Sequence, residues 1–289
     1  MPAVRPSPDR PTPRRWLLSV LRHIVRMPGL LALLVSGIVL TVLLGNPLTG
    51  RRGLLPARWW QPMVLAWSSA MMRLFGFRIR CHGTAVADPV LFVANHVSWL
   101  DIQAIHSQRA ASFVAKSEIS RWPVLGWLAR QAGTVFHRRG DPDSLQAVMA
   151  TMRERLRAGQ SIIVFPEGGT GRGDRVRPFH ARILQVALDT GVPIQPVALV
   201  YGRDGRMDLS VPFRPGEKFL TNALRLLGQA PMEARVHFLP PLIPDNQGRR
   251  QLAETARAGI AAVVDGTESP IAATVANAGT AGVGPGAGP

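Results

Sequence analysis

Cysteine is nearly absent from this sequence: Cys81 is the only one in 289 residues. A single thiol excludes an intrachain disulfide, and it excludes zinc or iron–sulfur sites built from several cysteines. Acidic residues are also scarce, since 18 Asp and Glu stand against 34 Lys and Arg and leave a formal charge of +16. Such an excess suits nucleic acid or an anionic membrane surface, and the distribution of the charges decides between them.

The basic excess is concentrated in the first third of the chain. Residues 1–87 contain twelve Arg but only one acidic residue, Asp9. No charge interrupts the stretch between Arg26 and Arg51, which includes the apolar run Gly29–Gly45. Basic residues beside an apolar helix fit anionic lipid headgroups better than a DNA groove. We therefore expect membrane lipids, and not nucleic acid, as partners.

The apolar run is short for a membrane span. As a helix its 17 residues rise about 25 Å, close to the lower limit for a hydrocarbon core of about 30 Å. No A-x-A-like site follows it, which argues against a cleaved signal peptide. Arg residues flank it on both sides, and Trp59–Phe77 is a second apolar segment with interfacial Trp residues. We expect a hairpin or monotopic insertion, with a core helix as the alternative interpretation of Trp59–Phe77.

The pattern divides the chain into four parts. Residues 1–13 and 266–289 lack apolar content and are expected to be disordered tails. Residues 14–77 are expected to form a membrane-associated helical segment. Residues 78–265 then form a single domain, which is an ordinary size for one hydrophobic core.

In this domain short β-branched or aromatic runs alternate with helix-like stretches such as Asp143–Ala158 and Phe179–Thr190. The alternation predicts an α/β fold, and we expect a mixed central sheet flanked by helices. The chemistry of such sheets collects in loops at strand ends. The expected strands lie in RIRC, VLFVAN, SFVAK, GTVFH, SIIVFP, IQPVALVY and RVHFLP.

The first candidate site is NHVSWLD, Asn95–Asp101, in which HVSWLD directly follows the expected strand VLFVAN. On an ideal helix His96 and Asp101 would point about 140° apart. They can meet only if His96 precedes the helix, and a strand-to-helix junction allows that. Asp101 could then accept from one imidazole nitrogen and leave the other to take a proton from a hydroxyl. A capping or structurally bonded histidine is the alternative.

The second candidate site is SIIVFPEGGTGRG, in which Glu167 and a run of glycines follow a strand. Glycines permit tight turns and close backbone approach, and with Arg172 and Arg175 nearby the loop could bind an anionic headgroup. The lysine of a P-loop is missing, which disfavours nucleotide binding. A plain turn is the alternative.

The third candidate site is GTVFHRRG, which places Arg138 and Arg139 after a short strand. Arg is suited to binding phosphate or carboxylate through paired hydrogen bonds, although exposed arginines usually face water. His137 and Asp141 have helical spacing, and we leave this pair out of the catalytic set.

Taken together, these segments resemble the glycerolipid acyltransferase family typified by 1-acylglycerol-3-phosphate acyltransferases. NHVSWLD is similar to the family's NHxxxxD, GTVFHRR to its GxxFxxR, VFPEGG to its FPEG, and VPIQPV to its late Pro-containing block. The resemblance covers about residues 75–215. It implies an α/β domain resting on the membrane, an acyl-CoA or acyl carrier protein donor, and neither a metal nor a cofactor.

The resemblance also implies roles for individual residues. His96 would deprotonate the acceptor hydroxyl for attack on the thioester carbonyl, with Asp101 orienting the imidazole. The remaining implied contacts are to substrate, from Gly133, Phe136 and Arg139 in the second block and from Glu167 and Gly168 in the third.

One departure leaves the acceptor open. The third block commonly continues FPEGTRS, but here Thr170 occupies the usual arginine position, and Arg172 is the nearest substitute. The longer form with its PFHA ending resembles acyltransferases that complete ornithine lipids. Lysophosphatidic acid and lyso-ornithine lipid are therefore both candidate acceptors.

The implied chemistry constrains location. A single crossing from a cytoplasmic N-terminus would place His96 outside, away from cytoplasmic thioester donors. We therefore expect a domain on the cytoplasmic face of the cell inner membrane. A non-catalytic, membrane-anchored lipid-binding protein is the alternative function.

Overall fold

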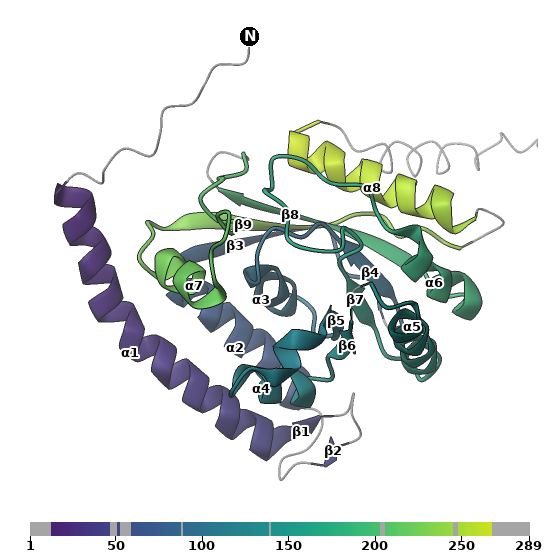
Figure 1. Cartoon of the computed structure of the whole chain (residues 1–289), viewed down its shortest axis with the longest axis horizontal. Coiled ribbons are helices and arrows are strands. Elements are labelled where there is room, and N and C mark those ends of the chain that lie inside the picture. The colour runs from purple at the N-terminus through teal and green to yellow at the C-terminus, as the bar shows by residue number, and fades with distance from the viewer. Residues whose placement is uncertain are drawn as a thin grey trace, which may run out of the picture.

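The computed structural model describes residues 13–46, 51–52, 59–87, 89–138, 140–202, 206–244 and 248–267. Its centre is a seven-stranded sheet with the order β3-β9-β8-β4-β7-β5-β6 (Figure 1). β8 and β9 are antiparallel, and the other neighbouring strands are parallel. The mixed sheet expected from the sequence is confirmed, and each of the seven expected runs overlaps one of its strands. These strands are β3 (Phe77–His82), β4 (Leu91–Ala94), β5 (Ser112–Lys116), β6 (Val135–His137), β7 (Ile162–Val164), β8 (Ile194–Gly202) and β9 (Met232–Phe238).

Helices cover both faces of the sheet (Figure 1), and the central strand β4 shows why. Its four residues are all fully buried, and alternate side chains of a strand point to opposite faces. Phe92 and Ala94 join the core cluster of α2 and α3, whereas Leu91 and Val93 join that of α5, α6 and α8. The helices are α2 (Trp60–Leu74), α3 (Leu100–His106), α4 (Leu125–Gln131), α5 (Pro142–Arg157), α6 (Gln185–Thr190), α7 (Phe219–Leu227) and α8 (Arg249–Asp265).

The expected helix Phe179–Thr190 is wrong at its beginning. A 3₁₀ turn occupies Ala181–Leu184, and the α-helix α6 starts only at Gln185. The backbone N–H of His180 donates to Pro166 O at 2.9 Å, so this residue is tied to the preceding loop in an extended conformation. The long loop between β7 and α6 is thereby folded back towards the end of β7.

Helix α1 (Pro13–Leu44) is longer than the apolar run Gly29–Gly45, because its basic residues belong to the same helix. His23 Nε2 donates to Leu224 O at 2.9 Å, and Arg26 donates to Leu227 O at 2.7 Å. Both acceptors are backbone carbonyls in the last turn of α7. The basic face of α1 therefore binds the globular domain.

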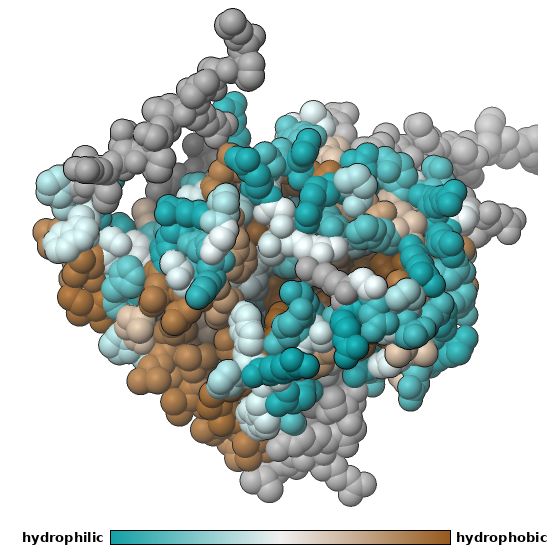
Figure 2. All heavy atoms as spheres, viewed as in Figure 1, coloured by the Kyte–Doolittle hydropathy of each residue, from teal (hydrophilic) through white to brown (hydrophobic). Residues whose placement is uncertain are grey.

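A second feature of α1 is the opposite, outward face. Among the described residues it is the one helix long and apolar enough to cross a membrane, and 11% of its most apolar window is buried. Figure 2 shows apolar atoms along this helix at the left and lower edge of the molecule. Its exposed apolar side chains are Trp16, Leu17, Leu18, Leu21, Ile24, Val25, Met27, Leu31, Val35, Val39 and Val42.

Helix α2 supports the core-helix interpretation of Trp59–Phe77, because it packs against both α1 and the sheet. Trp67 Nε1 donates to Leu33 O of α1 at 2.9 Å, while Met71 and Met72 are buried in the core against the sheet. The predicted tails lie outside the described residues except for Pro13, Gly266 and Thr267. A two-residue ladder of β1 (Gly45–Asn46) and β2 (Arg51–Arg52) follows α1.

Candidate active site

His96 lies in the loop between β4 and α3, ahead of the helix, as the spacing predicted. Its Nδ1 is 2.7 Å from Oδ2 of Asp101, which is fully buried in the first turn of α3. The same carboxylate oxygen accepts the N–H groups of Val97 and Ser98 at 2.7 and 2.9 Å. These bonds hold the loop and the imidazole together, and they leave Nε2 as the ring nitrogen that can take a proton.

The other oxygen of Asp101 has a partner that the sequence did not reveal. Tyr201 Oη, from β8, donates to Asp101 Oδ1 at 2.7 Å. Burial, together with the charge of Asp101, raises the pKa of Tyr201 well above its ordinary value, so the phenol stays a donor. Only the topology of the sheet indicates this contact. Because β4 and β8 are parallel neighbours, residues at or after their carboxyl ends share one edge of the sheet.

Glu167 lies beside His96 but contacts its backbone. Glu167 Oε1 accepts the N–H of His96 at 2.8 Å, and Oε2 accepts from Arg177 Nε at 3.0 Å. The Glu167 side chain is only 2% exposed. The N–H of Gly171 also donates to His96 O at 2.6 Å, so the Gly-rich loop binds both backbone groups of His96. Arg177 was not among the residues singled out from the sequence.

Gly168 is required by its surroundings. Its φ is +73°, a conformation that favours glycine. A Cβ at this position would lie 3.0 Å from Nε2 of His180. The glycine therefore lets the loop after β7 pass close to the His180 side chain, and both residues line the cavity described next.

A cavity of about 780 Å³ opens beside His96. Its walls include Gly37 and Leu40 of α1, Met63 and Trp67 of α2, and Leu128 of α4. The residues contributed by α1 and α2 carry no charge, so this part suits a hydrocarbon chain. Other elements contribute polar and cationic side chains to its wall, including Lys116, His137, Thr170, His180 and Arg182.

His96 differs chemically from its neighbours in this cavity. The His96 ring stacks on Phe165 with centroids 4.2 Å apart, and its side chain is 15% exposed. His106 also lines the cavity, but its Nε2 donates to Ala111 O at 2.9 Å, and burial lowers its pKa to about 4. His137 Nδ1 lies 3.3 Å from Ser144 Oγ. The carboxylate contact makes His96 the best placed general base.

The second-block residues are dispersed. Gly133 is buried in the turn between α4 and β6, and its carbonyl accepts from Arg155. Phe136 lies on β6 and lines a separate hollow against α5, and it is not among the described residues that line the main cavity. Arg139 lies outside the described residues. Arg138 is 73% exposed and pairs with Asp141.

The third-block arginine candidate also faces water. The Arg172 side chain is 81% exposed, with Nε 3.9 Å from Asp174, and it does not line the cavity, whereas Thr170 does. Asp141, the other half of the excluded pair, caps α5 by accepting the N–H groups of Asp143 and Ser144 at 3.0 Å. Its exclusion from the catalytic set is consistent with this geometry.

A buried carboxylate, an imidazole with one nitrogen left for a proton, and an apolar cavity together form a site for acyl transfer. The family model described as Acyltransferase matches residues 78–200. The chain is 36% identical over 252 residues to a lyso-ornithine lipid O-acyltransferase of Pseudomonas aeruginosa, covering 86% of this chain and 96% of that protein. The chain therefore belongs to this acyltransferase family, and it is an enzyme that acylates a lysolipid.

Two further similarities are to a second relative and to a solved structure. A 1-acyl-sn-glycerol-3-phosphate acyltransferase of Neisseria meningitidis serogroup B is 37% identical over 150 residues, which is 52% of this chain and 59% of that protein. The crystal structure of the 1-acyl-sn-glycerophosphate acyltransferase PlsC from Thermotoga maritima has a TM-score of 0.62 at 20% identity. That comparison covers 89% of this chain and 97% of PlsC, so the two proteins share their fold.

Proposed function

We propose that the enzyme transfers a fatty acyl group from a thioester to the hydroxyl of lyso-ornithine lipid, giving ornithine lipid. The observation that carries this proposal is the contact of His96 Nδ1 with buried Asp101 beside an apolar cavity. His96 Nε2 takes the hydroxyl proton while the hydroxyl oxygen attacks the thioester carbonyl. The C–S bond then breaks, and the imidazolium returns the proton to the departing thiolate.

The choice of acceptor rests on the loop after β7. A phosphate dianion is best held by arginine, but Thr170 lines the cavity where related enzymes place one, and Arg172 extends into solvent. His180 and Arg182 of the same loop line the cavity instead. They suit the single carboxylate of an ornithine headgroup. The extent of alignment with the Pseudomonas relative, compared with the Neisseria relative, supports the same choice.

The two faces of α1 support a monotopic placement. Its basic face forms hydrogen bonds to α7, and Gly37 and Leu40 line the cavity, so the helix lies along the surface of the domain. Its apolar face is exposed. We infer that α1 lies in one leaflet, with the domain on the cytoplasmic side of the inner membrane. There the cavity can receive a lipid chain from the bilayer and a thioester from the cytoplasm.

The test is an acyl-transfer assay on the full chain in vesicles. Lyso-ornithine lipid and lysophosphatidic acid are each offered with acyl-CoA and with acyl carrier protein as donors, and thioester consumption and ester product are both measured. We expect kcat/KM to favour lyso-ornithine lipid. A preference for lysophosphatidic acid would overturn the acceptor, and product formation with neither would overturn the function.

The matched variants are His96→Ala and His82→Ala. We expect His96→Ala to lower kcat by about 10²- to 10⁴-fold, the usual contribution of a general base. His82 lies on β3, where its ring stacks on His237 away from the cavity lining, so its removal should leave kcat near the wild-type value. Turnover by His96→Ala close to that of His82→Ala would exclude His96 as the base.

A further inference from the structure

Tyr201 is the only tyrosine in the chain, and it lies 100 residues from the aspartate that it contacts. We propose that Tyr201 is a positioning residue for the general base, because its hydroxyl fixes the carboxylate of Asp101 that orients His96. This proposal rests on the function proposed above for His96. Tyr201 itself does not line the cavity, so it acts through Asp101 and not on the substrate.

The hydrogen bonds of Asp101 show what Tyr201 contributes. Three donors, including His96 Nδ1, converge on Oδ2, while Oδ1 accepts from Tyr201 Oη. The carboxylate is fully buried, so water does not replace a missing donor at Oδ1. Without Tyr201 this oxygen would lose its partner, and the carboxylate would rotate to share its remaining donors. Such a rotation would misalign the imidazole.

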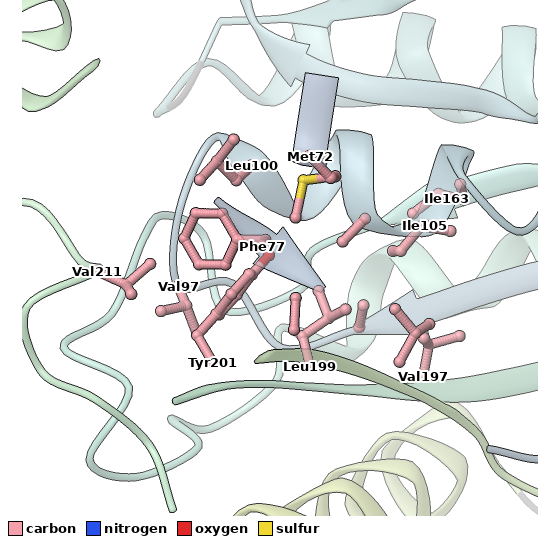
Figure 3. Close-up of a cluster of buried hydrophobic side chains, with 14 of the residues drawn as sticks. Met72, Phe77, Val97, Leu100, Ile105, Ile163, Val197, Leu199, Tyr201 and Val211 are labelled. Carbon is pink, nitrogen blue, oxygen red and sulfur yellow. The ribbon is translucent and has the colours of Figure 1, made fainter. Parts of the chain in front are cut away.

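Tyr201 is held rigidly enough to perform this task. Its ring is fully buried and meets Phe77 edge-on, with centroids 5.6 Å apart and an interplanar angle of 79°. Figure 3 shows both rings within the buried cluster that also contains Leu100 of α3. In the sheet ladder, Tyr201 also pairs with Ala234 of the neighbouring strand β9.

Asn95 fixes the strand that carries Tyr201. The β4–β8 ladder ends at the pair Ala94–Val197, and beyond it the Asn95 side chain takes over. Its amide Nδ2 donates to Leu199 O at 3.0 Å, and its Oδ1 accepts the N–H of Leu199 at 2.8 Å. Asn95 precedes His96 directly, and Leu199 is two residues before Tyr201. The catalytic loop and the tyrosine are therefore aligned by the same side chain.

The pH profile of kcat/KM separates a positioning role from a merely structural one. Asp101 contacts the imidazole at Nδ1, so a change in the hydrogen bonds of its carboxylate alters the charge that the imidazole faces. A loss of core packing alone leaves that contact as it is.

The test variant is Tyr201→Phe, which removes the hydroxyl and keeps the ring. We expect kcat to fall roughly 10-fold, the loss of a charge-assisted hydrogen bond, with the acceptor KM little changed. The acidic limb of the kcat/KM profile should shift along the pH axis relative to that of the wild type. Ser107→Ala is the control, because it removes another buried hydroxyl, one that donates to Ala104 O at 2.7 Å at the end of α3. It should change neither kcat nor the pH profile.

A double-mutant cycle with Asp101→Asn tests whether Tyr201 acts through Asp101. The double variant should be no slower than Asp101→Asn alone, because the path is already broken. Multiplied losses would overturn the proposal, as would an unshifted profile in Tyr201→Phe with uniformly lower kcat and a lower melting temperature. If His96→Ala retains turnover, the role of His96 as the general base fails, and the role proposed for Tyr201 fails with it. If His96→Ala is inactive and Tyr201→Phe behaves like wild type, only the role of Tyr201 fails.

Discussion

The backbone N–H of His96 donates to Glu167 Oε1 at 2.8 Å, so the glutamate of the Gly-rich loop positions the catalytic loop through its main chain. The other carboxylate oxygen holds Arg177, whose guanidinium also donates to Gly169 O. Glu167 thus joins two loops that come from different strand ends. It stabilises the site without needing to touch the substrate.

Replacing Glu167 should therefore damage folding and activity together. Glu167→Ala leaves the His96 N–H without its acceptor and Arg177 without its carboxylate, and we expect a loss of about 1–3 kcal/mol in the free energy of unfolding. Glu167→Gln keeps an acceptor for the N–H and should lose less of both. Denaturant titration and kcat measure the two effects. Glu254→Ala, which breaks the exposed pair with Arg257, is the control. Equal behaviour of Glu167→Ala and Glu254→Ala would contradict this role.

Two arginines between β7 and α6 should differ in their effects on acceptor binding. Arg182 lines the cavity, whereas Arg172 is 81% exposed and outside its lining. We expect Arg182→Ala to raise the KM for lyso-ornithine lipid roughly 3- to 10-fold, because a partner for the headgroup carboxylate is lost. Arg172→Ala should leave KM near the wild-type value. A larger effect from Arg172→Ala would place the headgroup on the outer side of the loop.

The sequence predicted the sheet well because strand formation is local. A short apolar or β-branched run bounded by turn residues carries its own signal, and runs such as VLFVAN and IQPVALVY each gave a strand. The predicted start of the helix at Phe179 was wrong, because a backbone hydrogen bond from His180 to Pro166 overrides the apparent helical pattern. The length of α1 was also underestimated, because hydropathy alone does not show that Arg22 and Arg26 bind α7.

The site could be predicted only in part, because some of its contacts join residues that are far apart in the sequence. His96 and Asp101 are five residues apart, so their meeting follows from one junction between a strand and a helix. Tyr201 and Arg177 reach the site from other strand ends, and no spacing within NHVSWLD points to them. The resemblance suggested Phe136 as a contact to substrate, but β6 turns it towards α5. This role stays a prediction that a Phe136→Leu assay can examine.

A pH-dependent contribution to stability comes from Glu217, which anchors the loop before α7. Hydrogen bonds from Arg225 lower the pKa of Glu217 to about 2. Glu217 also accepts from Asn222, whose side-chain oxygen accepts from Trp99 Nε1 at 3.1 Å. Trp99 lines the cavity next to the catalytic loop. Titration of Glu217 is therefore linked to the wall of the site.

The sign of this effect follows from the depressed pKa. Because the folded carboxyl has the lower pKa, its stabilising contribution is present above the ordinary value of 4.5 and is lost as the pH falls from there to about 2. Glu217→Gln should have a lower melting temperature at neutral pH and a smaller decrease across this range. Melting curves from pH 7 downwards provide the measurement. A variant whose melting temperature falls as steeply as that of the wild type would show that other carboxyls dominate.

The outward face of α1 gives the last prediction, on membrane binding. Leu31 is 65% exposed in the middle of this face, and Ile243, in the loop after β9, is also 65% exposed. If α1 lies in a leaflet, Leu31→Glu places a charge among lipid chains, and vesicle affinity should fall roughly 10-fold or more. Ile243→Glu should leave affinity unchanged, because it makes the same kind of change beside Leu242, which packs against the core cluster of Ile260 in α8. Co-sedimentation with anionic vesicles measures both. Equal affinities for the two variants would remove α1 as the membrane-binding element, whereas a loss confined to Leu31→Glu would identify the face that enters the bilayer.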